Sequence, residues 1–463
     1  MNFKTNVANF KLLLNKIIQV VPNYSIDDVS KNILLKSTNV DQQGKLDVYY
    51  SNETSITLKA SIQVETIEEG QIVINVKKLQ ALINEKYDKL PMEFIVDNHS
   101  DDDSITIITG NEKLVLDASL EEFHLTDKVT EILNIDNKLT QYKNFQQLQE
   151  SIDLTKQVLF KNDTINNLLN STMFAIAKED VYDVISEGLL FQSKGEFINV
   201  VAMSSKEGVR VARATCFQND KFPYPRDIDF ILPTTTAEFL RANNHDVLMS
   251  IFQNSDNYKV NYLRFDNVTQ VPEIVEFVLV STTIDGSYPN YEPLVPTNTT
   301  MVNYISLEKF INALKQINPI INADKDESSK WVVLNVFENP DNQSVLEVWT
   351  RNGKSEQIKC TFNVNLVSTG PEEEYKNNYI TSFNSKMLME IIDKLKATAI
   401  SNTPETELSL HFSDPNNTFV FKLSTDQKDS LAISLKPLPI DSEASFKTKN
   451  IRDFVKTVIE KDL

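Results

Sequence analysis

A threefold internal repeat constrains this sequence more than any other feature. The first landmark of the repeat is a short strand followed by a helix with apolar side chains at helical spacing, and it occurs at residues 1–21, 157–177 and 301–321. A second strand-then-helix landmark occurs at residues 70–91, 228–245 and 378–398. Its strand-to-helix junctions fall at Asn75, Pro233 and Asn384. Because both landmarks recur together, the sequence predicts three copies of one unit of about 150 residues.

The runs between these helices alternate apolar and polar residues, as in SITLKASIQVE (55–65), which is typical of strands. Each unit is therefore predicted to be two helices on an antiparallel sheet, an α+β fold in three tandem copies. The predicted domains are 1–127, 158–296 and 297–440. A helical insertion or linker is expected at 128–157. A C-terminal helical tail is expected at 441–463, because helical spacing relates Ile451, Phe454, Val455, Val458 and Ile459.

The composition favours a globular intracellular protein. Hydrophobic residues make up 41% of the chain and charged residues 24%, which argues against long disorder. No apolar stretch is long enough to span a membrane, and the N-terminus lacks a signal-peptide core, so a cytoplasmic location is expected. The two cysteines lie far apart without a partner motif, which supports neither a disulfide framework nor a zinc site.

Motifs that carry catalytic chemistry are missing from the sequence. Gly353, Lys354 and Ser355 resemble the end of a phosphate-binding loop, but Val348 stands where that motif needs its first glycine. The acidic runs 101–103 and 372–374 lie among loop-like residues and are interpreted as solvated loops. The sequence therefore predicts no enzyme, no metal site and no cofactor.

Four segments together resemble one known family. They are MNFKTNVANFKLLLNKIIQVVP (1–22), the run 178–216 with its Gly208-x-Arg210-Val211-Ala212 step, STTIDGSYPNYEPLVP (281–296) and FNSKMLMEIIDKLK (383–396). In order and spacing they are similar to the bacterial DNA polymerase III beta sliding clamp family. The very low glycine count, 9 in 463 residues, suggests a divergent member from a bacterial virus or a low-GC genome.

The resemblance implies a DNA sliding clamp, a polymerase processivity factor that forms a head-to-tail homodimeric ring. Its partners would be double-stranded DNA held without sequence preference, a DNA polymerase, a clamp loader and a second copy, with no membrane. The net charge of −19 opposes open-surface DNA binding, so cations should concentrate on the helices that line the hole. The expected DNA-facing residues are Lys11, Lys16, Lys77, Lys78, Lys86, Lys89, Arg241, Lys309, Lys315, Lys386, Lys394 and Lys396.

Two further sites follow from the resemblance. A hydrophobic pocket for client peptides would be lined by Ile185, Gly208, Val209, Val211, Pro233, Ala237, Asn384, Met387, Pro437, Leu438 and Ile440. The dimer interface would contain Leu114, Ile317, Ile320 and Ile321. Departures from the family are Lys436 for an apolar residue, Val209 for a histidine, and a second-unit first helix without a basic residue.

Two other classes of protein fit part of the pattern. A structural or adhesion protein of tandem α+β modules would also be acidic and lack catalytic motifs, but it has no reason to concentrate lysine on two helices per unit. A nuclease would need clustered carboxylates with histidine or lysine. The four histidines, His99, His124, His245 and His411, are too scattered to indicate such a site.

Overall fold

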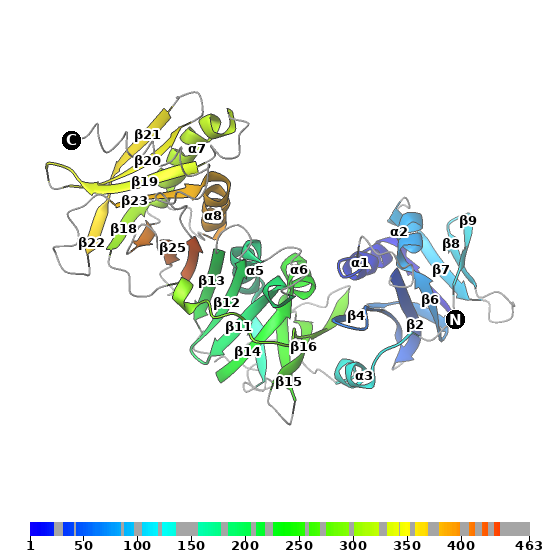
Figure 1. Ribbon diagram of the computed structural model, residues 1–463. Coiled ribbons are helices and arrows are strands. Elements are labelled where there is room, and N and C mark those ends of the chain that lie inside the picture. Colours follow the sequence, from blue (N-terminus) through cyan, green and yellow to red (C-terminus); the bar gives the residue numbers. More distant parts are fainter. Residues whose placement is uncertain are drawn as a thin grey trace. The chain divides into compact units, whose positions relative to one another are not determined.

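Figure 1 shows the computed structural model of this chain. The chain forms two compact units. The described residues are 1–22, 31–40, 43–84, 88–96, 104–118, 123–135, 156–176, 184–204, 210–217, 226–254, 259–268, 275–295, 301–323, 331–341, 343–351, 357–368, 379–398, 407–412, 419–424 and 430–435. Unit 1 comprises Met1–Asn166, Gln192–Glu196 and Gln218–Gly286, and unit 2 comprises Asn167–Phe191, Phe197–Phe217 and Ser287–Leu463. The division falls inside the second repeat.

The same order of strands and helices occurs three times along the chain. The first repeat contains β1 (Asn2–Asn6), α1 (Val7–Ile18), β2 (Asn32–Val40), β3 (Gln43–Ser51), β4 (Ile56–Gln63), β5 (Glu65–Glu68), β6 (Gly70–Asn75), α2 (Val76–Asn84), β7 (Pro91–Val96), β8 (Ser104–Thr109) and β9 (Glu112–Asp117). A short helix, α3 (Asp127–Leu133), follows it.

The second repeat contains β10 (Gln157–Phe160), α5 (Asn162–Thr172), the 3-10 turns η2 (Met173–Ala175) and η3 (Val184–Glu187), β11 (Gly188–Lys194), β12 (Phe197–Ser204), β13 (Arg210–Phe217), β14 (Arg226–Pro233), α6 (Thr234–Ala242), β15 (Asp246–Gln253), β16 (Val260–Val268) and β17 (Glu276–Thr282). The turn η4 (Glu292–Leu294) follows it. The third repeat contains β18 (Met301–Ser306), α7 (Leu307–Ala323), β19 (Trp331–Glu338), β20 (Ser344–Arg351), β21 (Gln357–Asn363), β22 (Asn365–Ser368), β23 (Tyr379–Asn384), α8 (Ser385–Thr398), β24 (Glu407–Phe412), β25 (Phe419–Ser424) and β26 (Ser430–Leu435). The predicted α+β fold in three tandem copies is confirmed.

Helices α1, α2 and α8 form where the sequence supplies both an apolar stripe and a capping side chain, whereas α6 follows Pro233 without a side-chain cap. In α1 the side-chain oxygen of Asn6 accepts a hydrogen bond from the backbone N–H of Asn9 at 2.8 Å, which satisfies a donor that the first turn leaves open. The helix buries one stripe of side chains, Val7, Phe10, Leu13, Leu14 and Ile17. Two predicted strand-to-helix junctions act the same way. Asn75 accepts from the N–H of Lys77 at 3.0 Å, and Asn384 accepts from the N–H of Met387 at 3.2 Å.

Unit 1 contains two antiparallel sheets. One is five-stranded, with the order β5-β1-β7-β8-β9. The other is eight-stranded, with the order β10-β15-β16-β17-β4-β3-β2-β6, and it runs from the second repeat into the first where β17 pairs with β4. We call this pairing the first seam. Helix α1 packs on β3 and β4, and it contacts α2 beside it.

Unit 2 is built on the same plan. A four-stranded sheet has the order β21-β20-β19-β23. In the larger sheet the strands β12-β13-β26-β25-β24-β18-β22 are consecutive, and the second repeat continues into the third where β13 pairs with β26. We call this pairing the second seam. In both units a continuous sheet therefore joins neighbouring repeats.

Helix α3 covers the face of the first seam that lies opposite the other helices. Ile132 and Leu133 of α3 pack with Val280 of β17, and Tyr49 of β3 lies against this cluster. On the other face of the same strand, Phe277 packs edge-on against Phe239 of α6, with 5.1 Å between ring centroids. The alternation of strand side chains therefore separates a face covered by α1 and α6 from an outer face covered by α3. The part of the predicted insertion that follows residue 135 and precedes 156 lies outside the described residues.

Candidate functional site

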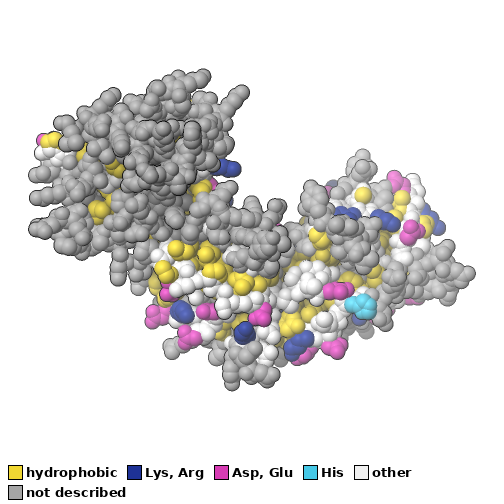
Figure 2. All heavy atoms as spheres, in the orientation of Figure 1, with side chains coloured by type: hydrophobic (Ala, Val, Ile, Leu, Met, Phe, Trp, Pro, Cys, Tyr) yellow, Lys and Arg dark blue, Asp and Glu magenta, His cyan; other side chains and the backbone are white. Residues whose placement is uncertain are grey.

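The repeated helices carry the opposite charge balance from the rest of the chain. Helices α1, α2, α5, α6, α7 and α8 contain ten basic and five acidic side chains, whereas the whole chain has 46 and 65. In α1 and α2 every charged side chain is basic. Figure 2 shows basic side chains gathered over α1 and α2 of unit 1. This distribution is what a surface for a polyanion requires on an acidic protein.

The predicted DNA-facing residues differ in exposure. Exposed side chains belong to Lys78, Lys89, Arg241, Lys309, Lys315 and Lys386. Half-buried side chains belong to Lys11, Lys16, Lys77 and Lys394. Lys86 and the side chain of Lys396 lie outside the described residues.

Two lysines of α1 are engaged in contacts. The Lys11 ammonium lies 2.8 Å from a carboxylate oxygen of Asp88. The Lys16 ammonium donates to the side-chain oxygen of Asn243 at 3.2 Å, and it lies 5.1 Å from the ring centroid of Phe277 and 5.5 Å from that of Phe239. Lys16 thus connects the first repeat to the second within unit 1. Sequence reasoning missed this because the partners lie more than 220 positions away.

The predicted pocket residues are only partly described. In unit 2, Val211 and Met387 are buried, and Ile185 and Asn384 are half-buried. In unit 1, Pro233 and Ala237 are buried at the start of α6. The remaining residues, Gly208, Val209, Pro437, Leu438 and Ile440, lie outside the described residues, as does Lys436.

The predicted interface residues fall into two groups. Leu114 lies on β9, at the edge of the five-stranded sheet of unit 1, and is half-buried. On α7, Ile317 and Ile321 are buried within unit 2, whereas Ile320 is half-buried. Leu114 is therefore the member of this set that lies on an open strand edge.

The two seams have the same register. In the first seam Ser61 of β4 is opposite Glu276, and in the second seam Thr215 of β13 is opposite Ser430. Ser61 and Thr215 hold equivalent places, because each hydroxyl donates to the side chain directly across its own repeat, Asp47 or Asn199.

The equivalent residues of the third repeat lie on an open edge. The β4-type strand of that repeat is β21, at one end of the four-stranded sheet of unit 2. The last strand of the first repeat is β9, at one end of the five-stranded sheet of unit 1. Within the described residues, each of these strands has a strand neighbour on one side only. Sequence reasoning missed the seams, because no local pattern shows which strands pair across repeats.

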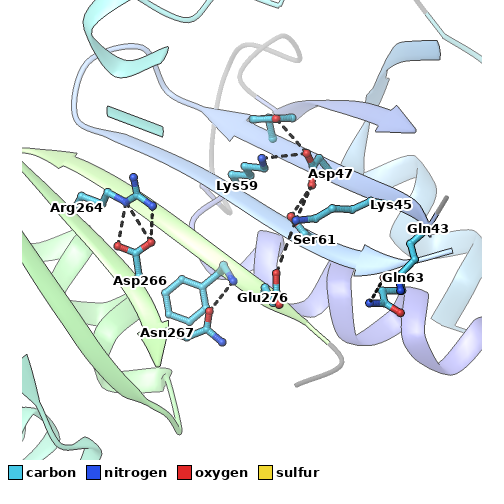
Figure 3. Close-up of polar contacts among 12 residues, drawn as sticks. Gln43, Lys45, Asp47, Lys59, Ser61, Gln63, Arg264, Asp266, Asn267 and Glu276 are labelled. Carbon is cyan, nitrogen blue, oxygen red and sulfur yellow. Dashed lines mark hydrogen bonds and ion pairs between the residues drawn. The ribbon is translucent and has the colours of Figure 1, made fainter. Parts of the chain in front are cut away.

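A polar network lies on the outer face of the first seam (Figure 3). Asp47 accepts from the hydroxyl of Ser61 at 2.6 Å and is 3.0 Å from the Lys59 ammonium. Lys45 lies 3.7 Å from a carboxylate oxygen of Glu276, across the seam. Burial, followed by the nearby charge of Asp47, raises the pKa of Tyr49 beside this network.

The third repeat carries the same constellation 300 positions later. Glu347 accepts from the indole N–H of Trp349 at 2.9 Å and from the Lys359 ammonium at 2.8 Å. The Lys359 ammonium lies 4.6 Å from the Trp349 ring centroid, as Lys59 lies 5.4 Å from that of Tyr49. This equivalence fixes the alignment of β21 with β4.

A buried ion pair on β16, drawn in Figure 3, holds α3 beside the first seam. Arg264 of β16 is 4% exposed and Asp266 is 1% exposed, and their closest charged atoms are 2.7 Å apart. The same guanidinium donates to the backbone oxygens of Ile132 and Ile135 at 2.7 Å each. Arg264 thus caps the carbonyl end of α3 while its charge is neutralised.

Other chemistry is limited in the part of the chain that the structure describes. No group of three His, Cys, Asp or Glu side chains there is arranged to hold a metal ion. The acidic runs 101–103 and 372–374 lie outside it. Cys216 is buried and Cys360 half-buried, and neither forms a disulfide within the described residues. None of the described helices is long and apolar enough to cross a membrane.

The chain is similar to proteins of one kind in both sequence and structure. It is 22% identical to the beta sliding clamp of Haemophilus influenzae over 412 residues, which cover 86% of this chain and 92% of that protein. It is 20% identical to the beta sliding clamp of Chlamydia muridarum over 307 residues, which cover 66% and 70%. No family model matches the chain.

Solved structures share the fold at low identity. The DNA polymerase III subunit beta of Pseudomonas aeruginosa has a TM-score of 0.67 at 16% identity, covering 95% of this chain and 100% of that one. A sliding clamp of the same organism bound to griselimycin has a TM-score of 0.68 at 16% identity, covering 95% and 99%. The fold of this chain is therefore that of these clamp proteins.

Proposed function

The chain belongs to the beta sliding clamp family, and from that premise we propose that it is a DNA sliding clamp, a polymerase processivity factor whose two copies close a ring around duplex DNA. The observation that carries the ring is the pair of open strands, β9 and β21. At both seams a β4-type strand pairs with the last strand of the next repeat. A second copy offers the missing partner to each open strand, so two copies in head-to-tail order complete the pattern.

The burial of one side chain supports this closure. Three residues occupy equivalent places on the last strands of the three repeats: Leu114, Leu279 and Ile433. Each is opposite the equivalent residue of the strand before it, which is Ile107 for Leu114, Phe265 for Leu279 and Phe421 for Ile433. Leu279 and Ile433 are fully buried at the two seams. Leu114 is only half-buried in a single copy. Pairing with β21 of a second copy would bury Leu114 as its equivalents are buried.

We propose that DNA contact is weak and spread over the basic helices. A ring that slides needs phosphate contacts that neither stop it nor read bases. The exposed Lys78, Lys315 and Lys386 are suited to that role, since their ammonium groups lie on the solvent side of helices whose other faces are buried. Lys16 is expected to contribute less, because it is engaged with Asn243.

We propose that polymerase and clamp loader bind through the hydrophobic residues inferred above for client peptides. The test variant is Leu438→Asp, which should abolish polymerase stimulation and leave the dimer intact. Val211→Asp is unsuitable, because Val211 is fully buried in β13 and a carboxylate there would disrupt the sheet. Deleting 441–463 should strengthen client-peptide binding or leave it unchanged. Weaker binding would make the tail part of the site.

We further infer that the chain acts without catalysis, as a tether, and works in the cytoplasm where bacterial DNA is replicated. This inference is supported by the similarity to sliding clamps and by the excess of basic over acidic side chains on the repeated helices.

The decisive experiment tests whether retention on DNA depends on topology. The protein is loaded onto nicked circular DNA with its clamp loader and the complex is isolated by gel filtration. A restriction enzyme then linearises half of the sample. The proposal expects the protein to stay on circles and to leave linear DNA.

A matched control separates ring closure from charge. Leu114→Asp places a carboxylate in the seam between copies, so it should give monomers in sedimentation and no retention on circles. Lys194→Glu, on an exposed side chain of β11, which is neither of the open strands, should be retained like wild type. Equal retention of wild type on circular and linear DNA would contradict the proposal.

A further inference from the structure

The open edges allow the seam between copies to be derived residue by residue, an inference that rests on the proposed ring. Both seams obey one register. Leu279 is opposite Leu58 in the first seam, and Ile433 is opposite Ala212 in the second. The two seams share no residue, yet in both of them the same position of the last strand is opposite the same position of the β4-type strand.

Applied to β21, this register identifies one residue for each position of the strand. Thr361 is the residue of β21 equivalent to Ser61 and Thr215. Thr361 is opposite Glu347 on the preceding strand of its own repeat. In the same way Ser61 is opposite Asp47, and Thr215 is opposite Asn199. The place of Leu58 and Ala212, three residues earlier, is then occupied by Ile358. On the other strand, the place of Leu279 and Ile433 is occupied by Leu114.

We propose that β9 of one copy pairs antiparallel with β21 of a second copy with Leu114 opposite Ile358, Lys113 opposite Lys359 and Glu112 opposite Cys360. The seam between copies is thereby marked by a pair of like charges.

The faces of the two strands agree with this register. The thiol of Cys360 contacts the side-chain oxygen of Gln316 on α7 at 3.4 Å, so Cys360 lies on the helix side of its sheet. The residue equivalent to Glu112 is Phe277, which packs against α6 and also lies on the helix side. Glu112 and Cys360 therefore point to the same face of the joined sheet. A register shifted by one residue would put them on opposite faces.

The charges distinguish this seam from the other two. The basic residue of the β4-type strand is Lys59, Arg213 or Lys359. Opposite the first two lie the uncharged Val278 and Ala432. Opposite Lys359 the register puts Lys113, which is exposed in a single copy. Like charges directly opposite each other destabilise a strand pair. In the proposed ring, the seam that must open to admit DNA is thus weakened by a like-charge pair at the place where each seam within the chain has one cation opposite an apolar residue.

Cross-linking tests the register directly. In Glu112→Cys, the new thiol and the native Cys360 of the second copy should form a disulfide on mild oxidation, because opposed residues in antiparallel strands have suitable Cα separations. The product is a covalent dimer on a non-reducing gel. Lys113→Cys is the matched control, since its side chain points to the other face. Glu112→Cys with Cys360→Ser removes the native thiol. Both controls should stay monomeric on the gel.

Charge reversal tests the weak point. Lys113→Glu should lower the dissociation constant of the dimer by roughly tenfold or more in analytical ultracentrifugation, because an opposite-charge pair replaces a like-charge pair in each of two seams. The gain should shrink at high salt. Lys194→Glu makes the same change in net charge on an exposed side chain of β11 and should not tighten the dimer.

The outcomes separate this inference from the proposed function. A wild-type protein that stays monomeric at micromolar concentration would overturn the ring itself. A wild-type dimer with no Glu112→Cys cross-link, or with cross-linking of Lys113→Cys instead, would overturn the register and leave the ring standing. A Lys113→Glu dimer whose dissociation constant is no lower than that of Lys194→Glu would contradict the proposed like-charge pair.

Discussion

The first and second seams share a register but are reinforced differently. At the first seam, Lys45 lies 3.7 Å from Glu276 of the strand across, and α3 covers the outer face with Arg264 holding its last carbonyls. At the second seam, Arg213 is opposite Ala432 and Thr215 is opposite Ser430, so these opposed pairs carry no opposite charges. The register is thus a property of the repeat, whereas the reinforcement is local.

This difference shows what each level of the sequence determines. Backbone pairing and the apolar inner face follow from the strand pattern, which all three repeats share. The outer face is free to vary, since it is not needed for the core. We therefore expect changes on the outer face of the first seam to loosen that seam while the second keeps its stability.

The largest effect is expected from Arg264→Met. The substitution leaves the Asp266 carboxylate, 1% exposed, without its partner, and it removes the donors to the carbonyls of α3. Breaking a buried pair from one side costs about 3–5 kcal/mol. Urea unfolding measures the loss, and hydrogen exchange should accelerate in β16 and β17 but not in β26.

A double variant makes this prediction sharper. Arg264→Met with Asp266→Leu removes both charges and should recover most of the lost stability. Lys259→Met is the matched surface control, because Lys259 and Asp285 form an ion pair whose side chains are 60% and 89% exposed. An effect of Lys259→Met equal to that of Arg264→Met would contradict the role of the buried pair.

An intermediate effect on stability is expected from lowering the pH, through His411 in the sheet that contains the second seam. Burial, and then the nearby charge of Lys422, lowers the pKa of His411 on β24 from 6.5 to about 4. The folded state thus binds this proton less readily than the unfolded state, so stability is retained above pH 6.5 and falls as the pH drops toward 4. Since the imidazole is partly exposed, the loss should be about 1 kcal/mol after discounting for solvent.

The histidine can be isolated by substitution. His411→Gln keeps a polar side chain that does not titrate, so the difference in unfolding free energy between variant and wild type should change between pH 7 and pH 4.5. Parallel curves for the two proteins would exclude His411 as the source.

The smallest effect is expected from Lys45→Met. Its ion pair with Glu276 crosses the first seam, but the two side chains are 35% and 42% exposed. Such pairs contribute about 0.2–1 kcal/mol, and salt screens them. The loss should be measurable in low salt by urea unfolding and should disappear in 1 M salt. A salt-independent loss would point to packing instead.

Much of the fold was predictable from spacing alone. The apolar positions of the three first helices, such as Phe10, Leu168 and Phe310, are buried as their spacing predicts. Asn75 and Asn384, predicted as strand-to-helix junctions, lie at those junctions and cap the helices that follow. These features are local, so a periodic pattern and a capping side chain specify them.

The candidate site was less predictable, because it depends on contacts between distant residues. Lys16 was predicted to face DNA from its place on a helix, yet its ammonium contacts Asn243 in another repeat. Arg264 carried no sequence signal at all, since its partners in α3 lie about 130 positions earlier. Which strand edges stay open is likewise a result of long-range pairing that no local window contains.

The open edge of β9 also bears on the fate of a copy that has not yet found its partner. An exposed strand offers unpaired backbone groups to any other chain and is a starting point for aggregation, which natural proteins oppose by placing lysine on the edge. Beside Lys113, Val115 is 59% exposed on the same strand. In the proposed ring, Lys113 would therefore protect the single copy from aggregation through the same charge that weakens the seam between copies. The Lys113→Glu variant keeps a charge on the edge and should retain that protection, whereas Lys113→Val should not.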